Sequence, residues 1–177
     1  MTNTEARKMM EGKRAVRFIN NQRRLASCGP TAIANLMKWL GYSPNSHDLL
    51  YKHCFSFNYK QHHGMVFRSI EKVLRGLNIP YNRRMNCTVK SIEKVLDEGS
   101  ACILAYRYWH DHKRKEHYAF IHGHTSKRFK ICNAHYATYD DRTYYNCQTR
   151  SKDAFRKIFD QSKRDCVMYP TIWVFSK

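Results

Sequence analysis

Apolar residues in the first hundred positions recur every three or four residues, which is the spacing of amphipathic helices. The spacing predicts a helix over residues 30–40, because Pro30 suits a first turn and Gly41 suits the residue after the last turn. Three more helices are predicted over residues 46–54, 66–77 and 88–99. Thr88 is expected to cap the last of them, and Gly99 is expected to end it.

The pattern changes after Gly99, where short apolar and aromatic runs predict strands. These strands are expected at residues 101–109, 117–124, 128–134 and 168–176, with a small helix at 151–160. Pro170 predicts an edge position or a bulge for the last strand. Helices followed by strands indicate an α+β fold in which N-terminal helices pack on a C-terminal antiparallel sheet. We expect one domain over residues 21–177, preceded by a basic N-terminal arm at 1–20.

Charge is the outlying property of the composition. The 177 residues include 32 Lys or Arg against 14 Asp or Glu, a formal net charge of +18. Such a surface attracts nucleic acid, anionic membrane surfaces or acidic proteins, although charge that only keeps the protein soluble is the alternative. No apolar run approaches the roughly twenty residues that span a bilayer, and no signal peptide is evident. Seven cysteines without a CxxC pair indicate reduced thiols, so we expect a cytoplasmic protein.

Cys28 stands at the start of the first predicted helix, immediately before Gly29 and Pro30. A helix N-terminus favours a thiolate through its free N–H groups and its dipole, so we expect a lowered pKa and a nucleophilic role for this cysteine. Such a nucleophile also needs a histidine base and oxyanion donors. Gln22 is close enough along the chain to supply one donor, and the backbone N–H of Cys28 is able to supply another.

The segment from Gln22 to Tyr42, QRRLASCGPTAIANLMKWLGY, resembles the nucleophile motif of papain-like cysteine peptidases, in particular the C39 and C39-like family. The resemblance extends in order over about residues 20–135: His117 opens an apolar strand, HYAFIHG, and Asn133 ends the next strand, RFKICN. It implies a papain-like fold and a peptidase with Cys28 as nucleophile, His117 as base, Asn133 as the orienting group and Gln22 as an oxyanion donor.

The sequence departs from the family in two places. The family usually has Asp, often followed by Pro, where this chain has Asn133-Ala134, although Asn orients the histidine in papain itself. A polar, basic insertion, WHDHKRKEH, precedes His117 and is expected beside the cleft. Basic residues flank the expected site on both sides, and we predict that they bind acidic or nucleic-acid-associated substrates: Arg23, Arg24, Lys113, Arg114 and Lys115.

Two other functions stay open. The same residues serve glutamine deamidation or transglutaminase-like acyl transfer as well as cleavage of peptide or isopeptide bonds, because water and amines compete for one acyl-enzyme. The other alternative is a basic nucleic-acid-binding module on a degenerate peptidase fold. The small size and the basic composition of the chain suggest a viral or mobile-element protein in a host cytoplasm.

Histidine pairs occur at 62–63, 110 and 112, and 122 and 124, but no Cys or carboxylate lies at a convincing spacing for zinc. We therefore expect no metal and no cofactor. Alternation along the predicted strand puts His117 on one face with residues 119, 121 and 123, and His122 and His124 on the other.

Overall fold

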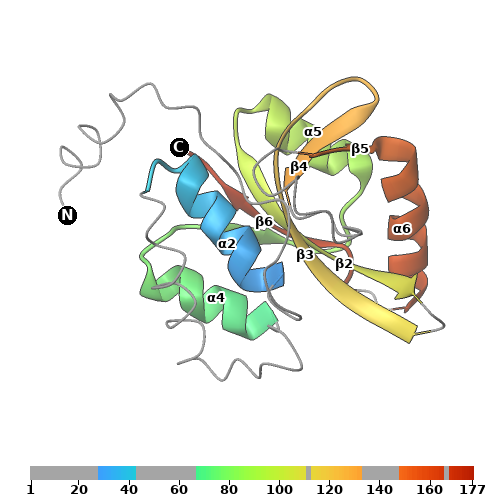
Figure 1. Ribbon diagram of the computed structural model, residues 1–177, viewed down its shortest axis with the longest axis horizontal. Helices are drawn as coiled ribbons and strands as arrows, with labels where there is room; N and C mark the ends of the chain where they lie inside the picture. The colour runs from blue at the N-terminus through green and yellow to red at the C-terminus, as the bar shows by residue number, and fades with distance from the viewer. Residues whose placement is uncertain (1–27, 43–66, 111–112, 133–147, 166–167) are drawn as a thin grey trace, which may run out of the picture.

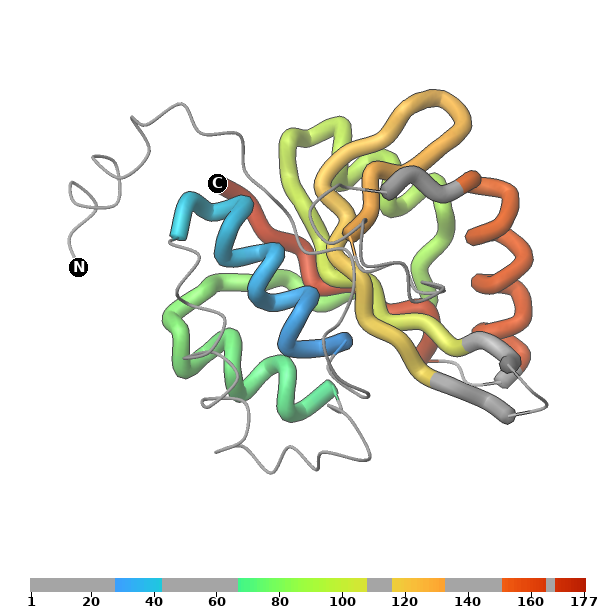
Figure 2. Tube along the Cα trace, in the orientation of Figure 1, coloured from blue at the N-terminus to red at the C-terminus, as the bar shows by residue number. Residues whose placement is uncertain are grey.

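Two pairs of helices enclose a six-stranded antiparallel sheet in the computed structural model, which describes residues 28–42, 67–110, 113–132, 148–165 and 168–177 (Figures 1 and 2). Helices α2 (Cys28–Trp39) and α4 (Phe67–Gly76) cover one face, and α5 (Val89–Asp97) and α6 (Lys152–Asp165) cover the other. The predicted α+β fold, with helices packed on an antiparallel sheet, is confirmed. No helix within these residues is long and apolar enough to cross a membrane.

The sheet has the strand order β1-β6-β2-β3-β4-β5. Its strands are β1 (Asn82–Arg84), β2 (Ala101–His110), β3 (Lys113–His124), β4 (Arg128–Cys132), β5 (Gln148–Ser151) and β6 (Thr171–Phe175). Each hydrogen-bonded pair of neighbours is antiparallel. Strand β2 lies in the middle and is buried on both faces, which explains its nearly continuous apolar run.

Two hydrophobic cores form because strand residues alternate between the faces. Ala101, Ile103 and Ala105 of β2 belong to the core under α2 and α4. The intervening residues, Cys102, Leu104 and Tyr106, belong to the core under α5 and α6. One strand therefore contributes to both cores.

The helix boundaries follow the local sequence signals. Thr88 caps α5: its side chain accepts the N–H of Ser91, and the Ser91 hydroxyl accepts the N–H of Thr88. Gly41 and Gly99 follow α2 and α5 at φ of 90° and 74°, values that favour glycine. At the end of α2, the N–H of Gly41 donates to Lys38 and that of Tyr42 to Met37, a Schellman motif.

The structure corrects three expectations about the strands. The final strand is not at an edge: β6 lies between β1 and β2, and Pro170 precedes it instead of interrupting its ladder. Much of the segment at 109–117 continues the β2–β3 hairpin, whose last pair is His110 with Lys113. Strands β1 and β5 were not predicted. The helix expected at 46–54 and the arm at 1–20 lie outside the described residues.

Candidate active site

Cys28 is the first residue of α2, and its thiol meets strand β3. Backbone N–H groups of Tyr118, Gly29 and Cys28 itself are directed at the sulfur. Only 7% of Cys28 is exposed, and it packs in the core beneath α2 and α4. Tyr118 directly follows His117, so the N-terminus of α2 approaches β3 at the residue next to the expected base.

Burial raises the pKa of the Cys28 thiol to about 11. The three backbone N–H groups act in the opposite direction, and the carboxylate of Glu116 adds to the increase. The expectation of a lowered pKa is therefore wrong, because removal of the thiolate from water outweighs the N–H groups at the start of the helix. At neutral pH this thiol is protonated, and any nucleophilic role requires a base that accepts its proton.

His117 lies in β3 and is only 2% exposed. Its ring meets the ring of its cross-strand partner Tyr106 edge-on, with centroids 5.5 Å apart. Tyr106 in turn contacts Phe155 of α6. Tyr106 belongs to the core under α5 and α6, and Cys28 belongs to the core under α2 and α4. Cys28 meets β3 at the backbone of Tyr118, the residue after His117.

The other expected site residues fall outside the described structure, wholly or in their side chains. Gln22, Arg23, Arg24 and Asn133 are not among the described residues. Residues 113–115 belong to β3 and pair with residues 108–110 of β2, but nothing is described of their side chains. The structure therefore places Cys28 and His117 in the fold, and the roles of all the expected site residues stay predictions.

A charged and aromatic cluster beside the thiol was not foreseen. Nε and Nη2 of Arg107 donate to Oε1 of Glu116 at 3.1 Å and 2.7 Å. The Arg107 guanidinium also lies 4.5 Å from the ring centroid of Tyr169. Glu116 precedes His117 and pairs with Arg107 across the strands. If the pairing of Tyr106 with His117 had been known, the ion pair between the neighbouring residues Arg107 and Glu116 could have been predicted from the sequence.

Ser162 of α6 fixes the backbone of β2 at Arg107. Its hydroxyl accepts the N–H of Arg107 at 3.1 Å and donates to the Arg107 carbonyl at 2.8 Å. Pairing between β2 and β6 ends at Ala105 with Thr171, so the serine replaces the strand partner that β2 lacks here. Ser162 is completely buried, which makes these bonds costly to lose.

His122 and His124 do not share a face, contrary to the prediction. The β3–β4 register shifts between Ile121 and Gly123. His122 stacks on Phe120, whereas His124 lies near Phe129 in the core under α5 and α6. An irregular register interrupts strict alternation, which sequence spacing does not reveal.

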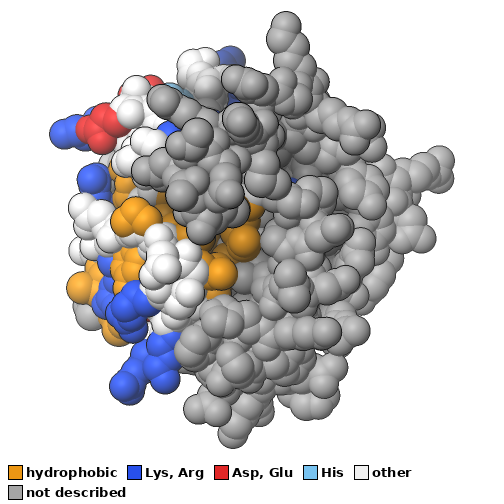
Figure 3. Space-filling view, turned by 90° about the vertical axis from the view of Figure 1, so that its left-hand side faces the viewer, with side chains coloured by type: hydrophobic (Ala, Val, Ile, Leu, Met, Phe, Trp, Pro, Cys, Tyr) orange, Lys and Arg blue, Asp and Glu red, His pale blue; other side chains and the backbone are white. Residues whose placement is uncertain are grey.

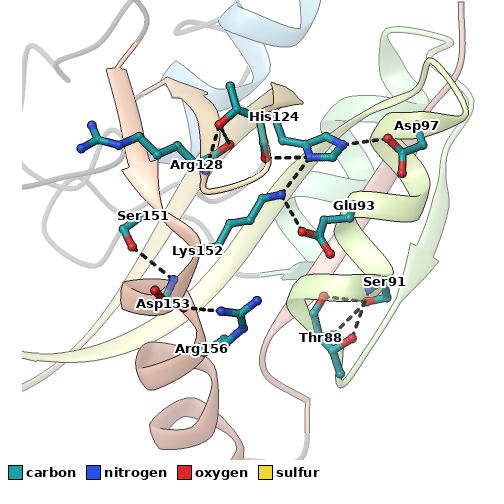
Figure 4. A network of polar contacts seen from close by, with 11 residues as sticks. Thr88, Ser91, Glu93, Asp97, His124, Arg128, Ser151, Lys152, Asp153 and Arg156 are labelled. Carbon is teal, nitrogen blue, oxygen red and sulfur yellow. Dashed lines mark hydrogen bonds and ion pairs between the residues drawn. The ribbon is translucent and has the colours of Figure 1, made fainter.

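His124 belongs to a polar network between α5 and α6 (Figure 4). Its Nε2 lies 2.8 Å from Oδ1 of Asp97, and its Nδ1 lies 2.9 Å from Nζ of Lys152. Lys152 is 3% exposed and also pairs with Glu93 at 2.5 Å. Among the described residues, no group of three or more His, Cys, Asp and Glu side chains has the arrangement of a metal site.

Comparison with known proteins agrees with this architecture. The model of the Peptidase C39 like family matches residues 14–167. The peptidase domain of Streptococcus ComA, a bi-functional ABC transporter involved in a quorum sensing pathway, is similar with a TM-score of 0.61 and 12% identity, over 92% of this chain and 100% of that one.

A C39-like peptidase from Bacillus anthracis is similar with a TM-score of 0.58 and 9% identity, over 92% of this chain and 95% of that one. No curated protein matches the chain. At these identities the two structures establish the fold, which is papain-like.

Proposed function

Because this chain belongs to the Peptidase C39 like family, we propose that it is a cysteine peptidase with Cys28 as nucleophile and His117 as general base. The observation that carries the proposal is the contact between Cys28, at the N-terminus of α2, and the backbone of Tyr118, next to His117. Papain-like catalysis requires a cysteine on a helix N-terminus and a histidine on a strand that it approaches.

The raised pKa of Cys28 defines the first chemical step. In our proposal His117 takes the thiol proton as sulfur bonds to the carbonyl carbon, instead of pairing with a thiolate formed beforehand. The carbonyl oxygen becomes an oxyanion, held by the N–H of Cys28 and the side-chain amide of Gln22. His117 then gives its proton to the leaving nitrogen as the carbon–nitrogen bond breaks.

Hydrolysis of the resulting thioester reverses the roles. His117 takes a proton from water, the water oxygen bonds to the acyl carbon, and the carbon–sulfur bond breaks with return of the proton to Cys28. Asn133 is proposed to orient the imidazole of His117 throughout. We propose a substrate that is an acidic or nucleic-acid-associated protein, cut at a peptide or isopeptide bond, on the strength of the net charge of +18.

A peptide-library digestion tests the proposal. The full chain and its Cys28→Ala variant are incubated with a proteome-derived peptide library, and products are identified by mass spectrometry. We expect new peptide termini with the wild type and none with Cys28→Ala. A Cys87→Ala variant, which removes another buried thiol, should retain cleavage.

Other results would contradict peptidase activity. Deamidated glutamines, or amines incorporated into glutamine side chains, would instead indicate an acyl transferase that uses the same thiol. A library unchanged by the wild type, together with salt-sensitive nucleic-acid binding that survives Cys28→Ala, would indicate a binding module on a degenerate peptidase fold.

A further inference from the structure

The outer side of α4 carries a row of basic side chains. Arg68, Lys72 and Arg75 follow one another at intervals of four and three residues, which places them on the same side of the helix. Ile70, Val73 and Leu74 are buried on the opposite side. Arg83 of β1 joins the row, because its Nη1 lies 2.8 Å from Oε1 of Glu71 on the same helix. We refer to Arg68, Lys72, Arg75 and Arg83 as the α4 basic face.

Negative charge is nearly absent from α2, α4 and β1. Glu71 is the only acidic residue in the sequences of α2, α4 and β1. It is already occupied, because it accepts hydrogen bonds from Arg83 at 2.8 Å and from Nε1 of Trp173 at 3.3 Å. Helix α5 on the other face has balanced charge, with Lys90 and Lys94 against Glu93 and Asp97. Helix α4 and strand β1 therefore carry an excess of positive charge that α5 lacks.

Figure 3 views the molecule from the side on which α2 and α4 lie, and it shows Lys and Arg side chains bordering apolar ones. Arg68, Arg75 and Arg83 are all exposed. At the far end of α4, Arg75 donates to the Tyr81 hydroxyl at 3.2 Å and borders a shallow hollow with residues 78–81.

The α4 basic face begins next to the nucleophile. Phe67, the first residue of α4, contacts the rings of Tyr118 and Tyr169, with centroids 6.4 Å and 5.0 Å apart. The backbone of Tyr118 in turn bonds Cys28. The N-termini of α2 and α4 lie at the same end of the helix pair (Figure 1). A ten-residue helix is about 15 Å long, so the face leads away from the thiol over that distance.

We infer that the α4 basic face binds an acidic segment of the polypeptide substrate while another part of that substrate reaches Cys28. This inference rests on the proposed role of Cys28 as nucleophile. Three of the four cations are arginines, whose planar guanidinium groups match carboxylates through paired hydrogen bonds. The ion pair of Arg83 with Glu71 shows one carboxylate held at this surface.

The composition of the surface favours polypeptide over nucleic acid. Proteins that bind single strands combine basic grooves with exposed aromatic rings on which bases stack. Among the side chains that the structure describes, Met85 and Met168 are the only exposed large hydrophobic groups, and no aromatic ring is exposed. Among the described residues, the α4 basic face therefore supplies charge without a fully exposed ring for stacking, since neighbouring Phe67 and Tyr81 are half-buried.

The test measures binding of a fluorescein-labelled oligo-glutamate peptide to the full chain carrying Cys28→Ala, with an oligo-glutamine peptide as reference. Arg68→Glu/Arg75→Glu reverses two charges on the face. Lys90→Glu/Lys94→Glu reverses two exposed charges on α5 and changes the net charge equally. We expect the α4 pair to weaken oligo-glutamate binding about tenfold at low salt, and the α5 pair to weaken it less than about twofold.

Two outcomes overturn the inference. Equal weakening by the α4 and α5 pairs would show that only the total charge matters. Tighter, α4-dependent binding of oligothymidylate than of oligo-glutamate would assign the face to nucleic acid. The milder Arg68→Gln/Arg75→Gln pair distinguishes the same outcomes if the charge-reversed chain fails to fold. Binding is measured on a chain without the nucleophile, so a failure to bind oligo-glutamate says nothing about the peptidase proposal. Alkylation of Cys28 tests that proposal separately.

Discussion

The hydroxyl of Ser162 bonds both backbone groups of Arg107, accepting its N–H at 3.1 Å and donating to its carbonyl at 2.8 Å. Helix α6 is thereby tied to β2 beyond the end of its pairing with β6. The Arg107 side chain then holds Glu116 on β3, next to His117. The position of the proposed base thus depends on a serine of another element.

Ser162→Ala should destabilise the fold, because it leaves the N–H and carbonyl of Arg107 without the hydroxyl in a buried place. We expect a loss of about 1–3 kcal/mol in the free energy of unfolding, measured by urea denaturation. Ser126→Ala, at an exposed turn, should change it by less than about 0.5 kcal/mol. Equal stability of Ser162→Ala and wild type would show that the bonds contribute nothing.

The free energy of unfolding should decrease in alkaline solution because of Cys28. Its pKa is raised from 9.0 to about 11 in the folded state. Between pH 9 and about 11 the unfolded chain releases the Cys28 proton, whereas the folded chain keeps it. The contribution of Cys28 to the free energy of unfolding is therefore complete below pH 9 and is lost as pH rises through about 11. The loss is on the order of 2 kcal/mol. Cys28→Ala should show a shallower decrease in urea titrations above pH 9, and identical slopes would contradict the raised pKa.

Glu116→Gln should make Cys28 easier to deprotonate. The Glu116 carboxylate raises the pKa of Cys28, although less than burial does. Removal of that charge should shift the pH profile of Cys28 alkylation to lower pH, by only a part of the increase in the Cys28 pKa from 9.0 to about 11. Glu98→Gln, at the end of α5, serves as the control and should leave the profile unchanged. A profile that moves to higher pH would show that the ion pair of Glu116 with Arg107 affects Cys28 more than the negative charge of Glu116 does.

Lys152→Met should destabilise the junction between α5 and α6. The ammonium of Lys152 is buried and lies 2.5 Å from Glu93 and 2.9 Å from His124. Methionine retains most of the side-chain volume but leaves Glu93 without its cation, at a cost on the order of 2 kcal/mol. Adding Glu93→Gln should restore part of the loss, whereas exposed Lys157→Met should have little effect. No recovery in the double variant would show that the loss does not come from leaving Glu93 without its cation.

Helices and central strands were predictable because their apolar positions recur at clear periods. Periods of three to four residues located α2, α4 and α5, and the apolar run at 101–109 located β2. Strands β1 and β5 have the sequences NRR and QTRS, which lack apolar alternation. Their place in the sheet depends on neighbours far along the chain, which local patterns do not specify.

The places of Cys28 on a helix and His117 on a strand were predictable, whereas the electrostatics around Cys28 were not. The motif around Cys28 and the apolar strand that contains His117 were recognisable from residue order, and the structure brings the thiol to β3. The sign of the pKa shift depends on burial, which follows from packing of α2 on the sheet. The contact of Arg107 with Glu116 depends on the register of β2 and β3, and its contact with Ser162 depends on where α6 packs. No local sequence pattern predicts either contact.

Alkylation of Cys28 near neutral pH, resolved by mass spectrometry and compared between wild type and His117→Ala, tests the central claim most directly. If His117 accepts the thiol proton, Cys28 should react faster with iodoacetamide than the buried Cys102 and Cys132. Its rate should then fall at least about tenfold in His117→Ala. Reaction of Cys28 no faster than those thiols, with no effect of His117→Ala, would contradict the assignment of Cys28 and His117 as nucleophile and base.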